Sequence, residues 1–175
     1  MAGFQPIHFI PRHRQAEMLE LQVESIIVAP HSQKSRTNHW CFYLSTSKWS
    51  SVRIDCQPSY SVPSSVLRGG SKANIVISEL PCLVSHDAQA QFKLDIPANL
   101  KVKSIHDLLV QNGRHKYEFD SNGVGCRFWT MDQLDLLHQN LLITNEAQLV
   151  AAKEAILKLW PDQTPLRLDQ GSYYQ

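Results

Sequence analysis

The sequence predicts an α+β fold in which an antiparallel sheet, built from about residues 20–119, is covered by helices. Strand signals fill the first two-thirds of the chain, helix signals gather in the last third, and the two kinds do not alternate. The chain has 175 residues and a hydrophobic content of 43%, which is enough for one core. We therefore expect a single domain with its core at about 20–160 and a peripheral C-terminal tail at 161–175.

The strand segments are short and are bounded by polar, Pro-rich or Gly-rich turns. The clearest is "SSVRIDCQP", in which apolar residues alternate with Arg53 and Asp55. The preceding strand, "TNHWCFYLST", is aromatic and is joined to it by a hairpin-sized link. The expected strands are 20–30, 37–46, 50–58, 73–80, 90–96 and a brief one at 115–119.

The helical segments carry recognisable start and stop signals. Ser104 is a candidate cap for a short helix that Gly113 ends. Asn145 opens a segment rich in strong helix formers, which Pro161 stops. The expected helices are 105–112, about 126–138 and 146–160.

Charge and hydropathy limit the partners. Seventeen basic and sixteen acidic residues leave a net charge of +1, so we expect no nucleic-acid partner and no attraction to an anionic membrane. No window is long and apolar enough for a membrane span, and the N-terminal segment is too broken by Pro6, His8 and Pro11 for a signal peptide. We expect a cytoplasmic protein with reduced thiols. The sequence does not indicate an oligomeric state.

The sequence contains no familiar cofactor motif. There is no CxxC pair, no GxGxxG after a strand and no P-loop, so we expect no metal and no cofactor. Cys41 and Cys56 lie on apolar strand faces and are expected in the core. The chain has four cysteines, namely Cys41, Cys56, Cys82 and Cys126.

Cys126 is the candidate nucleophile, because it lies where a glycine-broken loop becomes a helix. The free N–H groups and the dipole of a helix start favour a thiolate and can stabilise an oxyanion. Gly125 would let a substrate approach the backbone, and Arg127 adds a positive charge. The competing interpretation is that Cys126 is a small apolar residue used for packing.

His39 is the candidate general base. It begins the aromatic strand, and alternation places it on the same face as Cys41 and Tyr43. A strand holds an imidazole rigidly, which suits a base for a thiol. Asp55 on the next strand is the candidate orienter of His39, with a solvated strand face as the alternative.

Four further residues are candidates for substrate binding. Arg53 and Arg127 could bind a carboxylate, although ordinary salt bridges are the simpler explanation for both. Tyr43 and Trp129 would form the walls of a pocket, and the alternative for Trp129 is core packing.

The chain order of these residues resembles a known family. A strand reading His-x-x-x-Tyr-Leu from His39, a later strand carrying Tyr117, an Asn-containing loop and then Cys126 at a helix start resemble the circularly permuted papain-like (NlpC/P60-type) superfamily. Lecithin:retinol acyltransferase-like proteins and PPPDE-type peptidases belong to it. The resemblance covers about 39–142 and implies a permuted papain-like fold, with Cys126 as nucleophile and His39 as base.

The resemblance has departures. Asn122 is not adjacent to Cys126, and Ser51 occupies the zone of the acyltransferases' second histidine. The pair "HWCFYL" and "GCRFW" is also similar to an uncharacterised family of small fungal proteins, which supplies no activity.

Three functions stay open at this point. The first is thiol-dependent transfer or hydrolysis of an amide, ester or thioester, with a small-molecule or acyl/peptide substrate. The second is small-molecule binding on the same scaffold, with Cys126 structural. The third is protein interaction through the helices at 126–160.

Overall fold

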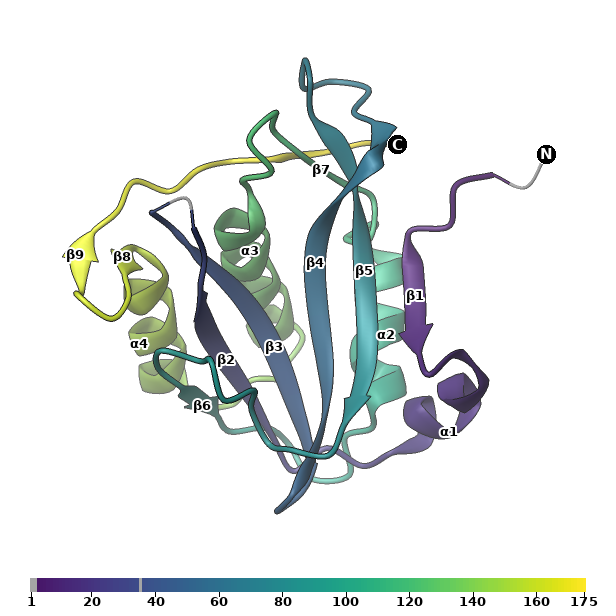
Figure 1. Ribbon diagram of the computed structural model, residues 1–175. Helices are drawn as coiled ribbons and strands as arrows, with labels where there is room; N and C mark the ends of the chain where they lie inside the picture. Colours follow the sequence, from purple (N-terminus) through teal and green to yellow (C-terminus); the bar gives the residue numbers. More distant parts are fainter. Residues whose placement is uncertain (1–2, 35) are drawn as a thin grey trace.

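The computed structural model describes residues 3–34 and 36–175. Within them, one sheet of eight strands runs in the order β10-β7-β5-β4-β3-β2-β6, and β1 pairs with β5 (Figure 1). The β1–β5 pair is parallel, and the other pairs described in this sheet are antiparallel. The predicted α+β class with an antiparallel sheet and packed helices is therefore confirmed. The strands are β1 Ile7–Ile10, β2 Ser25–Ser32, β3 Asn38–Ser47, β4 Ser50–Pro63, β5 Ser71–Leu80, β6 Phe92–Leu94, β7 Tyr117–Phe119 and β10 Ser172–Tyr173, with β8 Lys158–Leu159 and β9 Thr164–Pro165 forming a separate pair.

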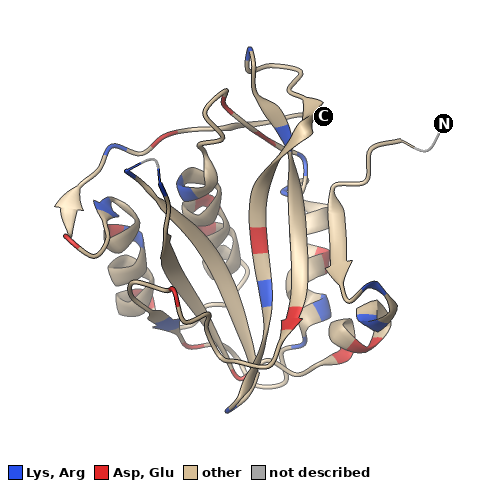
Figure 2. Cartoon of the chain, viewed as in Figure 1, with Lys and Arg blue, Asp and Glu red and all other residues tan. Residues whose placement is uncertain are grey.

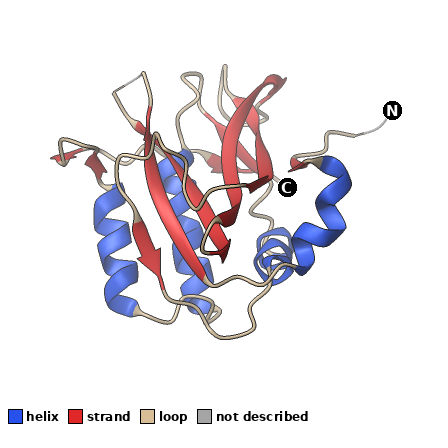
Figure 3. Cartoon of the chain, turned by 60° about the horizontal axis from the view of Figure 1, so that its bottom comes forward, coloured by secondary structure: helices blue, strands red, loops and turns tan. Residues whose placement is uncertain are grey.

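The helices pack in two pairs along the sheet, α3 beside α4 and α1 beside α2 (Figures 1 and 3). Helix α3 also packs against β3 and β4, which places its first turn beside the strands that carry the candidate base. The helices are α1 Gln15–Glu20, α2 Val102–Gln111, α3 Cys126–Gln139 and α4 Glu146–Ile156, and a short 3-10 turn, η1 Arg12–Arg14, precedes α1.

Strand β3 separates two apolar clusters. Trp40 and Phe42 lie in the main core under the helices, whereas Cys41 and Tyr43 lie in a smaller cluster on the opposite face. This distribution is the one that strand alternation predicts. The smaller cluster is closed by residues of the loop between β5 and β6, namely Leu83, Val84 and Ala88, together with Leu80.

Two helix boundaries differ from those expected. Helix α2 begins at Val102, so Ser104 lies inside its first turn and is not the cap. Helix α4 does begin after Asn145, whose side chain accepts a hydrogen bond from the Gln148 N–H at 3.1 Å. It ends at Ile156, earlier than expected, because the chain then turns into the β8–β9 hairpin.

The C-terminal tail is not wholly peripheral, as we had expected it to be. Strand β10 pairs with β7, and the Gly171 N–H donates to the Tyr117 hydroxyl at 2.9 Å. A Cβ at Gly171 would lie 2.4 Å from the Glu118 carbonyl oxygen, so only glycine permits this close approach. The tail therefore completes one edge of the sheet.

The charges of the described residues are dispersed. Lys and Arg occur on several elements and are interspersed with Asp and Glu (Figure 2). Among the described residues, no helix combines the length and the apolar character needed to cross a membrane.

Candidate active site

Cys126 is the first residue of α3, and a hydrogen-bonded loop fixes its position. The Asp120 carboxylate accepts from the N–H groups of Asn122 and Val124 at 2.8 and 2.9 Å. The Tyr117 hydroxyl donates to the Gly125 carbonyl at 2.8 Å. Gly125 has a φ of 147°, a conformation that side-chain-bearing residues rarely adopt. The glycine is thus needed for the turn itself, immediately before the thiol.

The start of α3 leaves its N–H groups available. Its N-cap is Gly125, which has no side chain to cap them. The first N–H groups of a helix have no intrahelical acceptor, and they carry the positive end of the helix dipole. The backbone around Cys126 is therefore suited to stabilise negative charge.

The Cys126 thiol points at the beginning of β3. Its Sγ lies 3.7 Å from the Asn38 carbonyl oxygen, and the residue is only 7% exposed. Asn38 is itself locked in place: its Nδ2 donates to the Trp160 carbonyl at 3.0 Å, and the Trp160 N–H donates to its Oδ1 at 2.7 Å. Asn38 is a positioning residue that the sequence did not reveal, because its partner lies 122 positions away.

His39 lies where β3 and β4 separate. The described pairing of these strands runs from Ser47↔Ser50 only to Phe42↔Ile54, so His39 and Asp55 lie beyond it. The His39 Nε2 and Asp55 Oδ1 atoms are 2.5 Å apart, a short, charge-assisted hydrogen bond. Asp55 is 8% exposed, which protects this bond from solvent.

The electrostatics of His39 connect it to both Asp55 and Cys126. Burial lowers the pKa of the His39 ring, but the charge of Cys126 and hydrogen bonds to Asp55, Cys126 and Cys41 outweigh burial and hold this pKa well above its ordinary value. Burial likewise raises the pKa of Asp55, but the hydrogen bond and charge of His39, followed by Arg53 and Cys41, leave it below its ordinary value. An ionised carboxylate beside an imidazole with a raised pKa is the charge pattern of a charge-assisted His–Asp pair.

Cys41 also belongs to this group of side chains; we expect it in the core, but on the same strand face as His39. It is buried in the smaller cluster, yet its Sγ lies within 4.8 Å of ligand atoms on both His39 and Asp55. Burial raises the pKa of the Cys41 thiol to about 11, so the thiol stays protonated near neutral pH. Spacing in the sequence shows that Cys41 shares a face with His39, and its proximity to Asp55 follows from the β3–β4 register, in which these two residues come next after the pair Phe42↔Ile54.

Arg53 lies on the same face as Asp55, two residues earlier on β4. Its Nε is buried and has no hydrogen-bond partner among the described residues. Tyr43 is directed elsewhere, because its hydroxyl hydrogen-bonds His31 Nε2 at 2.9 Å and Ser85 Oγ at 3.1 Å. Tyr43 is thus part of a second polar network and does not form a wall beside Cys126.

Arg127 and Trp129, which we had considered for substrate binding, are structural residues. Arg127 is 1% exposed, and its guanidinium donates to the carbonyls of Ile156, Leu166 and Arg167 at 2.5–2.9 Å. These hydrogen bonds hold the end of α4 and the C-terminal tail against the start of α3. Trp129 is also 1% exposed, and its ring packs edge-on against Phe42. Arg127 follows Cys126 directly, and the helical rotation of about 100° turns it away from the thiol. Trp129, almost one turn further on, lies on the same side of the helix as Cys126 and is packed into the main core.

An open hollow of about 280 Å³ reaches His39 from the surface. Gly123 lies in its wall, and a Cβ there would meet the Tyr60 hydroxyl at 2.4 Å, so this tyrosine covers the loop before Cys126. The lining residues are Gln33, His39, Gln57, Pro58, Tyr60 and Gly123.

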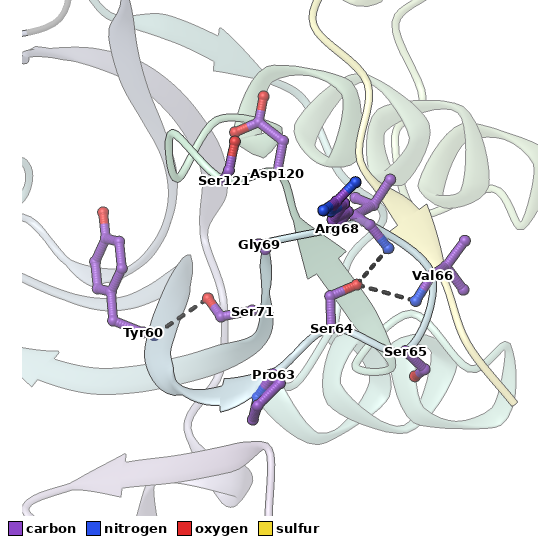
Figure 4. Close-up of a pocket in the computed structure, with 12 residues that line it drawn as sticks. Tyr60, Pro63, Ser64, Ser65, Val66, Arg68, Gly69, Ser71, Asp120 and Ser121 are labelled. Carbon is purple, nitrogen blue, oxygen red and sulfur yellow. Dashed lines mark hydrogen bonds between the residues drawn. The ribbon is translucent and has the colours of Figure 1, made fainter.

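A second hollow, of about 400 Å³, lies beyond Tyr60 at the loop between β4 and β5 (Figure 4). The buried Glu118 carboxylate anchors this loop by accepting from the hydroxyls of Ser64 and Ser65 and from the N–H groups of Ser65 and Val66, at 2.5–3.2 Å. Tyr60 lines both hollows, so it separates the polar loop from the approach to His39.

The fold and the site together define an α+β protein in which a thiol at the start of a helix lies against a strand that carries a histidine hydrogen-bonded to a carboxylate. Residues 25–174 match the family described as "Domain of unknown function (DUF7770)", and the chain belongs to this family. No curated protein and no solved structure matches the chain.

Proposed function

We propose that this protein is a thiol-dependent hydrolase or acyltransferase in which Cys126 is the nucleophile, His39 the general base and Asp55 the orienting carboxylate. The observation that carries the proposal is that His39 hydrogen-bonds the Asp55 carboxylate at 2.5 Å, while the Cys126 thiol lies 3.7 Å from the carbonyl oxygen of the adjacent residue, Asn38, and contributes to the raised pKa of His39. Because His39 uses Nε2 for Asp55, its Nδ1 is left for the thiol. A nucleophile held by a base that a third group orients is the recurring arrangement of covalent catalysis.

The reaction follows from these roles. His39 takes the thiol proton, and the thiolate attacks the carbonyl carbon of an amide, ester or thioester. The carbonyl electron pair moves to oxygen, where the free N–H groups at the start of α3 stabilise it. The intermediate collapses, His39 protonates the leaving group, and an acyl thioester remains on Cys126. Water or a second nucleophile then attacks this thioester, its proton passes to His39, and the thiol is restored.

The exposure of the site constrains the substrate. Cys126 is 7% exposed, whereas His39 opens into the hollow beside Tyr60. An acyl group would enter through this hollow, which suits a small molecule or an extended peptide end. With four free cysteines, the protein would work where thiols stay reduced, as in the cytoplasm.

The resemblance to permuted papain-like proteins supports the same roles. In that superfamily the histidine strand precedes the cysteine helix, as β3 precedes α3 here. We extend the resemblance to the chemistry of Cys126 and His39 only.

One observation favours a non-catalytic alternative. Cys126 belongs to the main apolar core, and its Sγ faces a backbone carbonyl. Under this alternative the thiol packs the corner between α3 and β3, and the protein binds a small molecule or another protein on the same scaffold.

Alkylation rates separate the two functions. Iodoacetamide near neutral pH, followed by peptide mass spectrometry, should modify Cys126 faster than the partly exposed Cys82 of the same molecule. His39→Ala should slow the reaction at Cys126 and leave Cys82 unchanged, because only Cys126 loses its base. Equal rates at both thiols in the wild type, or an unchanged Cys126 rate in His39→Ala, would establish the packing role instead.

A further inference from the structure

The side chains around His39 include a group that the acyl-transfer proposal does not use. Cys41 faces the same space as His39 and Asp55, and one ligand atom from each of the three residues lies within 4.8 Å of the others. Strands β3 and β4 hold all three, with His39 and Cys41 two positions apart on one strand. The arrangement is thus a property of the rigid sheet and not of a flexible loop.

From this juxtaposition we propose that His39, Cys41 and Asp55 form a binding site for a zinc-like divalent cation, which switches off the thiol chemistry when it binds. Imidazole nitrogen, thiolate sulfur and carboxylate oxygen are the three ligand types that zinc uses in proteins. Three protein ligands leave a fourth position for water, which can reach His39 from the hollow beside Tyr60.

The geometry requires only a small adjustment. Metal–ligand distances of about 2.0–2.3 Å place tetrahedral ligands roughly 3.5 Å apart. The three ligand atoms lie within 4.8 Å of one another, so the widest of these separations has to shorten by at most roughly 1 Å. A small side-chain rotation provides this change. The cation replaces the proton between His39 and Asp55, and the Cys41 thiol releases its proton as it binds.

The charges also balance. A divalent cation with the Cys41 thiolate, the Asp55 carboxylate and a neutral imidazole has a net charge of zero. Arg53 on the same face therefore meets a neutral complex and not an additional cation. Because Cys41 is 3% exposed and Asp55 is 8% exposed, bulk water would compete weakly for the ion.

The effect on the thiol rests on the proposed function. A His39 ring that donates its electron pair to the metal can no longer accept the proton of Cys126. Metal binding itself does not require Cys126, so the two proposals can be tested separately.

The first experiment measures binding in a tag-free Cys126→Ala chain, where the nucleophile cannot contribute a ligand. Zn²⁺ titration by calorimetry should give one site per chain, and Co²⁺ should produce a thiolate charge-transfer band. Adding Cys41→Ser should remove the band and weaken Zn²⁺ binding about tenfold or more, the cost expected for disturbing a metal site. Asp55→Asn, which preserves the shape of the side chain, should weaken binding similarly.

Cys82→Ser is the matched control, because Cys82 lies outside the cluster and its loss should leave both signals unchanged. The absence of saturable binding, or unchanged binding in both Cys41→Ser and Asp55→Asn, would overturn the metal site. Loss of the band in Cys82→Ser would overturn it too, since the ligand would then be another thiol.

The second experiment adds Zn²⁺ to the wild-type chain and follows alkylation, with Cys82 as the internal reference. The cation should slow modification of Cys126 in the wild type but not in Cys41→Ser. If Zn²⁺ binds at Cys41 but leaves the Cys126 rate unchanged, the metal site stands, and the activation of Cys126 by His39 is wrong instead.

Discussion

Asp55→Asn isolates the contribution of the carboxylate to the reactivity of Cys126. Asparagine keeps the volume of Asp55 and can still hydrogen-bond His39, but it carries no charge. A hydrogen bond to a charged group contributes about 1.5–3 kcal/mol and a neutral one about 0.5–1.5 kcal/mol, so the substitution should cost about 1–2 kcal/mol. Asp55 is 8% exposed, and solvent screening reduces this value little. With a factor of ten for every 1.36 kcal/mol, alkylation of Cys126 should slow by about 5- to 30-fold.

The assay is the time course of iodoacetamide modification near neutral pH, read as the ratio of Cys126 to Cys82. Asp87→Asn is the matched control. Asp87 Oδ1 lies 3.1 Å from His31 Nδ1, and His31 is the cross-strand neighbour of His39. Asp87→Asn therefore removes a carboxylate, here an exposed one, from a histidine that does not contact Cys126, and the ratio should stay constant. A wild-type rate in Asp55→Asn, or an equal decrease in both variants, would refute the role of Asp55 as the orienter.

Two further predictions concern the surroundings of the site. Arg127→Met should lower the free energy of unfolding by about 3 kcal/mol in urea titrations, because three buried backbone carbonyls lose a charged donor; a loss below about 1 kcal/mol would contradict the structural role. Burial raises the pKa of Glu118, but hydrogen bonds from residues 64–66 outweigh burial and leave this pKa below its ordinary value. The carboxylate therefore stabilises the fold at any pH above its ordinary pKa, and this stabilisation is lost as the pH falls through the lowered pKa. Glu118→Gln should therefore be less stable than the wild type at pH 7 in thermal melts, with a difference that narrows toward pH 3; a constant difference would contradict the linkage.

Local patterns were sufficient to predict most of the sheet and the two apolar faces of β3. Trp40 and Phe42 face the helices while Cys41 and Tyr43 face away, as alternation requires. Strand β1 was not predicted, because it is a short segment stabilised by parallel pairing with β5, far along the chain. The same holds for β10, whose two residues depend on the pairing with β7.

The candidate site was only partly predictable. The sequence paired His39 with Asp55, and their side chains lie 2.5 Å apart, while Cys126 contributes to the raised pKa of His39. Arg127 was a candidate for substrate binding because it follows Cys126 in the sequence. Its side chain instead binds backbone carbonyls at and after the end of α4, and sequence proximity to Cys126 cannot indicate these distant partners. Cys41 was assigned to the core with the reservation that it shares a face with His39; its approach to Asp55 follows from the β3–β4 register, in which Cys41 and Asp55 come next after the pair Phe42↔Ile54.

The final test asks whether an acyl group resides on Cys126. Stoichiometric incubation of the purified chain with an activated acyl thioester, followed by rapid quenching in acid and peptide mass spectrometry, detects such an intermediate. The account predicts a single acyl group per chain, on Cys126, that is lost in Cys126→Ala and strongly reduced in His39→Ala. An acyl group spread over Cys82 and lysines, or one on Cys126 that forms equally fast in His39→Ala, would contradict it.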